Sequence, residues 1–275
     1  MALARVERIL ILAKTYPSPS AQYVETSCVA GIAHDGSMRR LFPVPFRMVE
    51  DVRQFKKWQW VEVRVEKASK DHRPESHKVY IDTIHCGEVI DTKNAWAGRW
   101  PWLDKMPSFE SFDAIEAARL TDGLSLALLR PKRLLGLDIT KSRHTDWTDE
   151  EREKLLQDQM QGSLFSEAEQ RRELKQLRKV PFDFYYRYLY DTQDGEKQHR
   201  HKIVDWEAGA LYWKCRQSYG SGWEGPFRAK LEEDLGNKEL MFLMGNLHRF
   251  QEQWLIVSLI YPPRRRPDEC QMVLL

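Results

Sequence analysis

Two apolar runs flank a turn in the stretch Thr26-Ser-Cys-Val-Ala-Gly-Ile-Ala-His-Asp-Gly-Ser-Met-Arg-Arg-Leu-Phe42. The runs are residues 26–32 and 38–42, and His34-Asp-Gly-Ser37 lies between them. Asp-Gly in this position is a strong hairpin signal because both residues accept the backbone conformations of tight turns. The stretch therefore predicts two antiparallel strands joined at Asp35 and Gly36.

Three further strands are predicted around this hairpin. Residues 6–14 contain Ile9-Leu-Ile-Leu-Ala13, a run that is typical of a buried strand. Residues 58–67 alternate between apolar and charged side chains, and residues 79–84 form another apolar segment. Five strands with short turns within about ninety residues are typical of a small barrel or curled sheet. We therefore expect residues 1–92 to form a small β-barrel-like domain.

The rest of the chain mixes helix and strand signals, so the predicted fold class is α+β. Residues 93–180 are expected to be a helical, partly irregular connecting region, in which Ser108 suits the N-cap of a helix that runs to Ala118. Residues 181–275 are expected to form a mixed α/β domain. The predicted strands after residue 120 are 125–129, 134–139, 182–190, 202–206, 240–244 and 254–260, and the predicted helices follow Asp146 and Ser166 and cover 208–215 and 228–235.

The charge balance limits how the chain could bind an anionic partner. Its 43 Lys and Arg nearly equal its 41 Asp and Glu, which leaves a net charge of +2 over 275 residues. The field of the whole chain is therefore weak, and any nucleic-acid surface has to be a local patch.

Cysteine use and hydropathy indicate the compartment. The four cysteines lie far apart and form no C-x-x-C pair, a spacing that suits free thiols in a reducing compartment. The N-terminal apolar run at residues 9–13 is too short for a signal peptide, and no stretch approaches a membrane span. We expect a cytoplasmic protein with no membrane partner.

Several common enzyme signatures are absent from the sequence. It contains no Walker A, H-E-x-x-H or G-x-S-x-G motif, and the G-x-G-x-x-G spacing at residues 220–225 lacks the strand–helix context that a phosphate cradle needs. The usual nucleotide-binding, zinc-protease and serine-hydrolase interpretations therefore have no support in this chain.

The densest set of proton-transferring and metal-binding side chains lies between His199 and Glu207. Strand alternation would place His199, His201 and Asp205 on one face, with Glu207 at the following turn into a helix. Such a set could act catalytically around a divalent cation such as Mg²⁺, with a distant carboxylate, for which Glu239 is the candidate, as a third ligand. The competing interpretation makes Asp205 the helix N-cap and Glu207 a partner of the helix dipole.

A second candidate site combines cations with aromatic rings in the N-terminal domain. A proline-stiffened loop follows the first predicted strand, and basic residues lie beside aromatic ones further along the domain. Cations suit a phosphate backbone and rings suit base stacking, so these residues predict a surface that binds DNA or RNA. Alternatively, the loop packs on the barrel and the cations stay solvated. The predicted nucleic-acid-binding residues are Lys14, Tyr16, Arg39, Arg40, Arg47, Lys56 and Lys57.

A third candidate is the peptide Gln161-Gly-Ser-Leu-Phe165. It resembles the short bacterial sliding-clamp-binding motif, which implies that Gln161 would bond the rim of a clamp pocket while Leu164 and Phe165 fill it. Gly162 departs from the leucine usual at that position of the motif. Alternatively, Leu164 and Phe165 staple the helix predicted after Ser166.

Three functions are compatible with these features. The first is a nucleic-acid-associated protein that serves in DNA processing or defence. The second is a metal-dependent hydrolase, most readily a nuclease, centred on Asp205 and Glu207. The third is a non-enzymatic module that binds partner proteins through its aromatic residues and the segment Gln161–Phe165.

Overall fold

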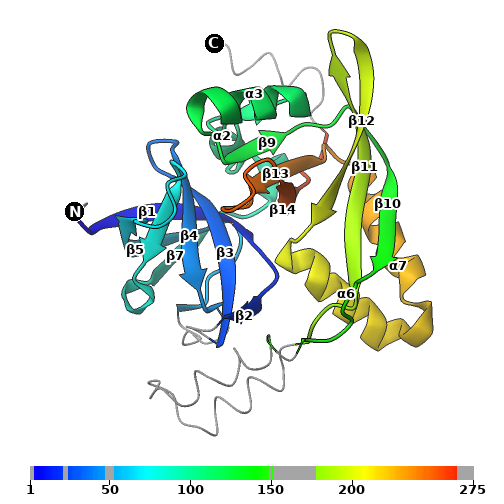
Figure 1. Cartoon of the computed structure of the whole chain (residues 1–275), viewed down its shortest axis with the longest axis horizontal. Coiled ribbons are helices and arrows are strands. Elements are labelled where there is room, and N and C mark those ends of the chain that lie inside the picture. Colours follow the sequence, from blue (N-terminus) through cyan, green and yellow to red (C-terminus); the bar gives the residue numbers. More distant parts are fainter. Residues whose placement is uncertain (1–2, 21–23, 47–52, 149, 151–177, 265–275) are drawn as a thin grey trace, which may run out of the picture.

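The computed structural model of the chain describes residues 3–20, 24–46, 53–148, 150 and 178–264. Figure 1 shows two β-sheet bodies side by side, the N-terminal one in blue and cyan and the second in green, yellow and orange. A few helices cover the second sheet, so the chain has the predicted α+β class. No helix among the described residues is long and apolar enough to cross a membrane.

The N-terminal body is a closed five-stranded barrel, which confirms the predicted barrel-like domain. Its strands pair in the order β1-β3-β4-β6-β5, and β1 closes the ring on β5. The pair β4–β6 is parallel and the other pairs of the ring are antiparallel, a topology similar to that of the oligonucleotide-binding (OB) fold. The bounds are β1 Arg5–Lys14, β2 Ser18–Ser20, β3 Val24–Ala33, β4 Met38–Val44, β5 Gln59–Lys67, β6 Ser76–Val79 and β7 His85–Val89.

The hairpin predicted from the Asp-Gly turn is the β3–β4 pair. Ile32 lies opposite Met38, and the amide of Ala33 donates to the carbonyl of Ser37 at 2.9 Å. Gly36 has a φ of 87°, a left-handed conformation that a side chain would disfavour. These contacts confirm the predicted hairpin. It was predictable from the sequence because the turn depends only on neighbouring residues.

The predicted strand at 79–84 is wrong after its first residue. Strand β6 ends at Val79, and Ile81–Thr83 form the 3₁₀ turn η3 before β7 begins at His85. An apolar run of this length does not by itself distinguish a strand from a tight turn.

The second sheet has the order β10-β11-β12-β14-β13-β9-β8. Its pairs β12–β14 and β8–β9 are parallel, and the others are antiparallel. The bounds are β8 Ser108–Phe109, β9 Leu126–Leu129, β10 Arg133–Lys141, β11 Phe182–Thr192, β12 Gly195–Ile203, β13 Met241–Asn246 and β14 Trp254–Ile260.

The helices are short. Helix α3 begins after Ser111, whose hydroxyl accepts from the amide of Ala114 at 3.1 Å, whereas the predicted cap Ser108 lies in β8. The sequence prediction therefore placed this cap one turn too early. The bounds are α1 Lys93–Trp96, α2 Trp100–Leu103, α3 Phe112–Asp122, α6 Trp206–Tyr219, η5 Gly220–Gly222, α7 Glu224–Arg228 and the π-helix η6 Ala229–Asp234.

Strands β8, β9 and β10 lie inside 93–180, the region that the sequence predicts to connect two domains. All three belong to the second sheet, in which β8 pairs with β9, β9 with β13 and β10 with β11. The helix predicted from Ser166, and almost all of the one predicted after Asp146, lie outside the described residues.

Alternating side chains pack the two bodies together. On β1, Ile9 and Ile11 fill the barrel, whereas Leu10 and Leu12 face the second sheet. On β9, Leu126 and Leu128 meet the barrel, and the alternate residues Ala127 and Leu129 face the other side. A strand buried on both faces reads as a continuous apolar run, which explains Ile9–Ala13.

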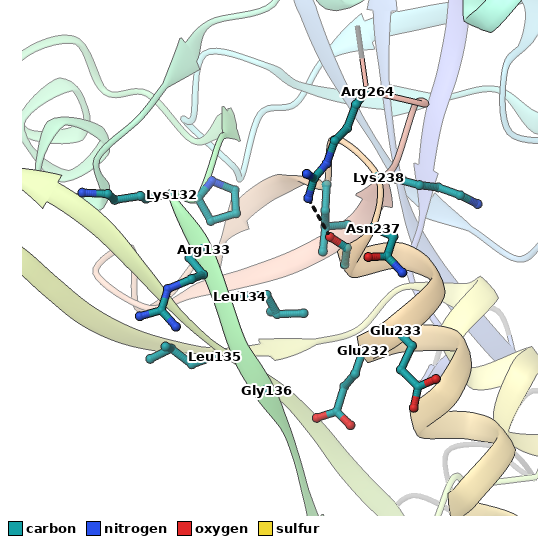
Figure 2. Close-up of a pocket in the computed structure, with 13 residues that line it drawn as sticks. Lys132, Arg133, Leu134, Leu135, Gly136, Glu232, Glu233, Asn237, Lys238 and Arg264 are labelled. Carbon is teal, nitrogen blue, oxygen red and sulfur yellow. Dashed lines mark hydrogen bonds between the residues drawn. The ribbon is translucent and has the colours of Figure 1, made fainter. Parts of the chain in front are cut away.

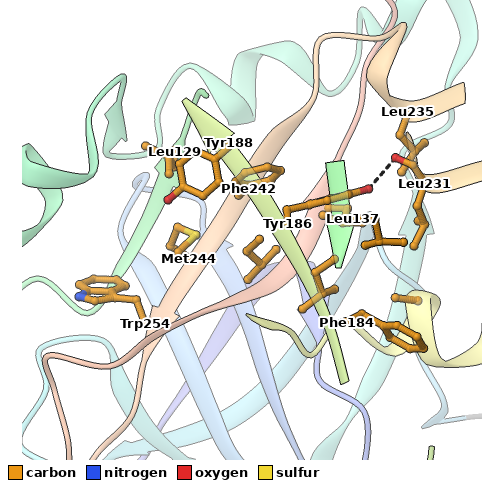
Figure 3. Packing of buried hydrophobic residues seen from close by; sticks show 14 of the residues in the cluster. Leu129, Leu137, Phe184, Tyr186, Tyr188, Leu231, Leu235, Phe242, Met244 and Trp254 are labelled. Atoms are coloured by element: carbon orange, nitrogen blue, oxygen red, sulfur yellow. Dashed lines mark hydrogen bonds between the residues drawn. The ribbon is translucent and has the colours of Figure 1, made fainter. Parts of the chain in front are cut away.

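The outer core of the second sheet packs under α6, α7 and η6 (Figure 3). Tyr186 lies at its centre, stacked on Phe242 with ring centroids 5.4 Å apart. Its hydroxyl donates to the carbonyl of Leu231 at 2.7 Å, so the buried polar group is satisfied.

The edge strand β10 is closed by side chains rather than by another strand. The amide of Leu137 donates to Glu232 at 2.6 Å, and Arg228 donates to the Leu137 carbonyl, also at 2.6 Å. Both partners come from the helical segment α7–η6, and Figure 2 shows Glu232 lying beside β10 near Gly136.

Candidate nucleic-acid interface

A groove of about 560 Å³ lies where the barrel meets the second sheet. The barrel contributes residues of β3, β4, β5 and β6 and of the β5–β6 loop, residues 68–75. The second sheet contributes the end of β13 and the turn that follows it. The lining includes Arg40, Phe42, Lys67, Lys70, Lys78 and His248.

The groove carries an excess of positive charge. Two carboxylates, Glu66 and Asp71, line it together with five Lys and Arg side chains. Burial by itself would raise the pKa of Asp71, but hydrogen bonds from Arg73 and Ser76 hold that pKa well below its ordinary value. Asp71 is therefore ionised and already engaged by Arg73. The remaining cations make the groove a favourable place for an anion.

An aromatic ring lies among these cations. Phe42 follows four buried residues of β4 and is 49% exposed. Phe42 and Lys78 both line the groove, and the ammonium of Lys78 lies 5.1 Å from the ring centre of Tyr80. An exposed ring in a groove that cations also line offers a stacking surface for a base near contacts for its phosphate.

Buried hydrogen bonds hold the β5–β6 loop in place. Arg73 donates to the side-chain oxygen of Asn246 at 3.2 Å, which ties the loop to β13. The carboxylate of Glu75 accepts from the amide of Ser125 at 3.1 Å, which ties it to the start of β9. The loop therefore presents Lys70 from a fixed frame, and less ordering is needed when a ligand binds.

Of the seven predicted nucleic-acid-binding residues, Arg40 lines this groove. Arg39 does not, because its side chain is buried and ion-paired with Glu7 at 2.6 Å. Lys56 is exposed in the segment before β5, and Arg47 lies outside the described residues.

Lys14 lies at the junction between the barrel and α6 instead of on an open surface. Its ammonium donates to the carbonyl of Phe55 at 3.1 Å and lies 3.8 Å from the ring centre of Phe46. Burial lowers the pKa of Lys14 to about 8, against the opposing attraction of Glu207 and Asp205. The prediction that Lys14 contacts nucleic acid is not supported by this position.

Tyr16 and Lys57 join the same junction. The hydroxyl of Tyr16 accepts from the indole of Trp213 at 2.9 Å. Lys57 lies 3.3 Å from a carboxylate oxygen of Glu207 and donates to the carbonyl of Leu259 at 2.6 Å. These side chains hold the barrel against α6, so neither lies on a common surface with Arg40.

Gly209 on α6 makes room for the Tyr16 ring. A Cβ atom at this position would lie 2.3 Å from a Tyr16 ring carbon. We expect Gly209→Ala to lower the free energy of unfolding by about 1–3 kcal/mol, because the ring has to move away. Urea unfolding measures this loss, and Gly225→Ala in α7, where a Cβ meets no atom within 4 Å, is the matched control. Equal stabilities of the two variants would contradict the close packing.

The predicted catalytic residues separate into two places. His201 is buried with its Nδ1 2.8 Å from the Tyr188 hydroxyl, and His199 stacks on it at 4.4 Å. Asp205 instead faces the barrel junction, because β12 ends at Ile203 and the alternation of side chains ends with it.

Asp205 is the N-cap of α6, as the competing interpretation held. Its carboxylate accepts from the amide of Glu207 at 2.8 Å and from that of Leu259 at 2.8 Å. Glu239 pairs with Arg130 at 2.8 Å. The described part of the chain contains no group of three or more His, Cys, Asp or Glu that could hold a metal ion, so the predicted Mg²⁺ site is not formed there.

Gln161, Leu164 and Phe165 lie outside the described residues. The sequence analysis missed the groove residues of β5, β6 and the loop between them. The polar turn Lys67-Ala-Ser-Lys-Asp-His-Arg73, placed between two strands, is the signal that could have found them.

A second cavity, of about 700 Å³, lies between β10 and η6 (Figure 2). Its lysines are already paired, Lys132 with Asp191 and Glu196, and Lys238 with Asp234. These two lysines are therefore less available to an anion than the lysines of the groove.

Family comparisons divide the chain at the boundary between the two bodies. A domain of unknown function (DUF8758) matches residues 5–105, and a second domain of unknown function (DUF8757) matches residues 108–274, more than half of the chain. The chain belongs to the DUF8757 family. The DUF8757 match begins at β8 and includes the whole second sheet, whereas the DUF8758 match includes the barrel. The groove therefore lies between the barrel and the DUF8757 domain.

No curated protein matches this DUF8757 chain. Among solved structures, one of a Replication Protein A heterotrimer bound to ssDNA is similar with a TM-score of 0.26 and 9% identity, over 99% of this chain and 68% of that one. A likeness at this TM-score carries no argument about function.

Proposed function

We propose that the chain binds single-stranded nucleic acid in the groove between the barrel and the DUF8757 domain. The observation that carries the proposal is Phe42, an exposed ring in a groove that Lys67, Lys70 and Lys78 also line. Base stacking needs a free base face, which a single strand offers and a duplex does not. The OB-like topology of the barrel supports the proposal, since such barrels serve as oligonucleotide-binding modules.

We expect the affinity of this complex to fall as the salt concentration rises. Each phosphate contact with a single strand contributes about −0.7 to the slope of log K against log salt. Lys67, Lys70 and Lys78 together therefore predict a slope near −2. One stacked base adds about 1–3 kcal/mol, largely independent of sequence.

We expect Phe42→Ala to weaken binding of a single-stranded oligonucleotide about 5- to 150-fold, because the stacking surface is lost. Fluorescence anisotropy of labelled DNA and RNA oligonucleotides across a salt series measures the loss. In the same series, Lys70→Gln and Lys78→Gln should each reduce the slope by about 0.7.

Tyr219→Ala is the matched control, since Tyr219 is 59% exposed at the end of α6 and does not line the groove. Lys93→Gln is the matched control for Lys70→Gln and Lys78→Gln, because Lys93 is an exposed cation on α1. The proposal fails when the unmodified protein shows no salt-sensitive affinity for either nucleic acid. It also fails when Phe42→Ala binds as well as Tyr219→Ala.

A further inference from the structure

Arg40 is a buried cation inside the groove. Its side chain is 4% exposed and lines the cavity. One terminal nitrogen donates to the carbonyl of Ser125 at 2.7 Å, and the other lies 3.6 Å from the sulfur of Cys28. The Nε atom is buried and has no hydrogen-bond partner among the described residues.

Arg40 also lacks a carboxylate. Among the residues that the structure describes, no acidic oxygen lies within 4.0 Å of its guanidinium, whereas Arg39 and Arg73 pair with Glu7 and Asp71. Glu75 is linked to Arg40 through Ser125, whose hydroxyl lies 3.3 Å from a terminal nitrogen of Arg40 and donates, as the Ser125 amide does, to the Glu75 carboxylate. A buried charge without a counter-ion is destabilising by several kcal/mol.

Other cations extend the positive site from Arg40 toward solvent. Lys67 lines the same cavity half-buried, and its ammonium donates to the carbonyl of Arg73 at 2.8 Å, with burial lowering its pKa. Lys70 and Lys78 lie exposed at the rim. Positive charge therefore continues from solvent to a buried guanidinium, whose planar nitrogens match phosphate oxygens.

We infer that the groove receives a terminal phosphate of a nucleic-acid strand and that Arg40 is its anchoring residue. This inference rests on the proposed function. A phosphomonoester carries about −1.5 to −2 charges at neutral pH, whereas an internal phosphodiester carries one. A buried unpaired cation together with Lys67 therefore favours the strand end over the strand interior.

Oligonucleotides of one sequence test the inference, with a 5′-phosphate, with a 3′-phosphate and with neither. We expect the unmodified protein to bind one phosphorylated form at least tenfold more tightly than the form without a terminal phosphate. Arg40→Gln should bring that ratio close to one. Arg64→Gln should leave it unchanged, because Arg64 is exposed on β5, stacked on Tyr80 outside the groove.

A second measurement covers the case in which Arg40→Gln does not fold. Inorganic phosphate should raise the Tm of the unmodified protein above that in sodium chloride of equal ionic strength, and Lys67→Gln should reduce the difference. Equal affinity for all three oligonucleotides overturns the inference but leaves the proposed function intact. A phosphate effect on Tm without oligonucleotide binding overturns the proposed function and leaves an anion site. An unchanged ratio in a folded Arg40→Gln variant removes Arg40 from the site.

Discussion

Asp205→Ala is expected to lower the free energy of unfolding by about 3–5 kcal/mol. The side chain is 3% exposed and accepts from the amides of Glu207 and Leu259, both at 2.8 Å. Alanine removes the cap of α6 and leaves two backbone donors without a partner, each at about 1–3 kcal/mol. It also removes the carboxylate that lies 4.0 Å from the half-buried Lys57. The loss is large because one carboxylate joins α6, β14 and the barrel.

Urea unfolding followed by circular dichroism measures this loss. Glu207→Ala is the matched control, because that side chain is 53% exposed and its pair with Lys57 is partly solvated, which predicts about 0–1 kcal/mol. Asp205→Asn keeps one acceptor oxygen and should fall between the two. An Asp205→Ala protein with the midpoint of the unmodified protein would contradict the capping role.

Acidification from pH 7 to pH 5 should destabilise the protein by about 2 kcal/mol through His201 alone. Desolvation by burial, together with repulsion from His199, lowers the pKa of His201 from 6.5 to about 3. Between those two values the unfolded chain binds a proton that the folded chain excludes. The free energy of unfolding therefore rises with pH across this window. The stability that depends on a neutral His201 is lost as the pH falls below 6.5.

The comparison of His201→Gln with the unmodified protein isolates this contribution. Glutamine cannot titrate and can still bond the Tyr188 hydroxyl. Its stability difference between pH 7 and pH 5 should be smaller by about 2 kcal/mol. His85→Gln, at an exposed position on β7, is the matched substitution at a histidine outside this cluster. The same dependence in His201→Gln would show that His201 is accessible to protons in the folded state.

Sequence reasoning found the barrel because its signals are local. The Asp35-Gly36 turn fixes the β3–β4 register within a few residues. The apolar run Ile9–Ala13 identified a buried strand, but a run does not say which two bodies cover its faces. For the same reason β9 and β10 were recognised as strands while their place in the second sheet was not.

The site was harder to predict because residues that are adjacent in the sequence have different surroundings in the fold. Arg39 and Arg40 follow each other on β4, yet one pairs with Glu7 and the other lines the groove. Tyr16 looked available in a proline-rich loop, but its ring packs on a glycine of α6 that is far away in sequence. Composition identifies a cation or a ring, and only the tertiary contacts decide what it meets.

The bonds to Leu137 also limit how β10 can pair with a strand of another molecule. A sheet whose last strand shows free amides and carbonyls acts as a template on which a foreign strand can assemble. At Leu137 the side chains of Arg228 and Glu232 already make the bonds that an incoming strand would need. At that position the helical segment α7–η6 takes the place of an eighth strand. The outer edge of β10 is therefore closed to a foreign strand at Leu137.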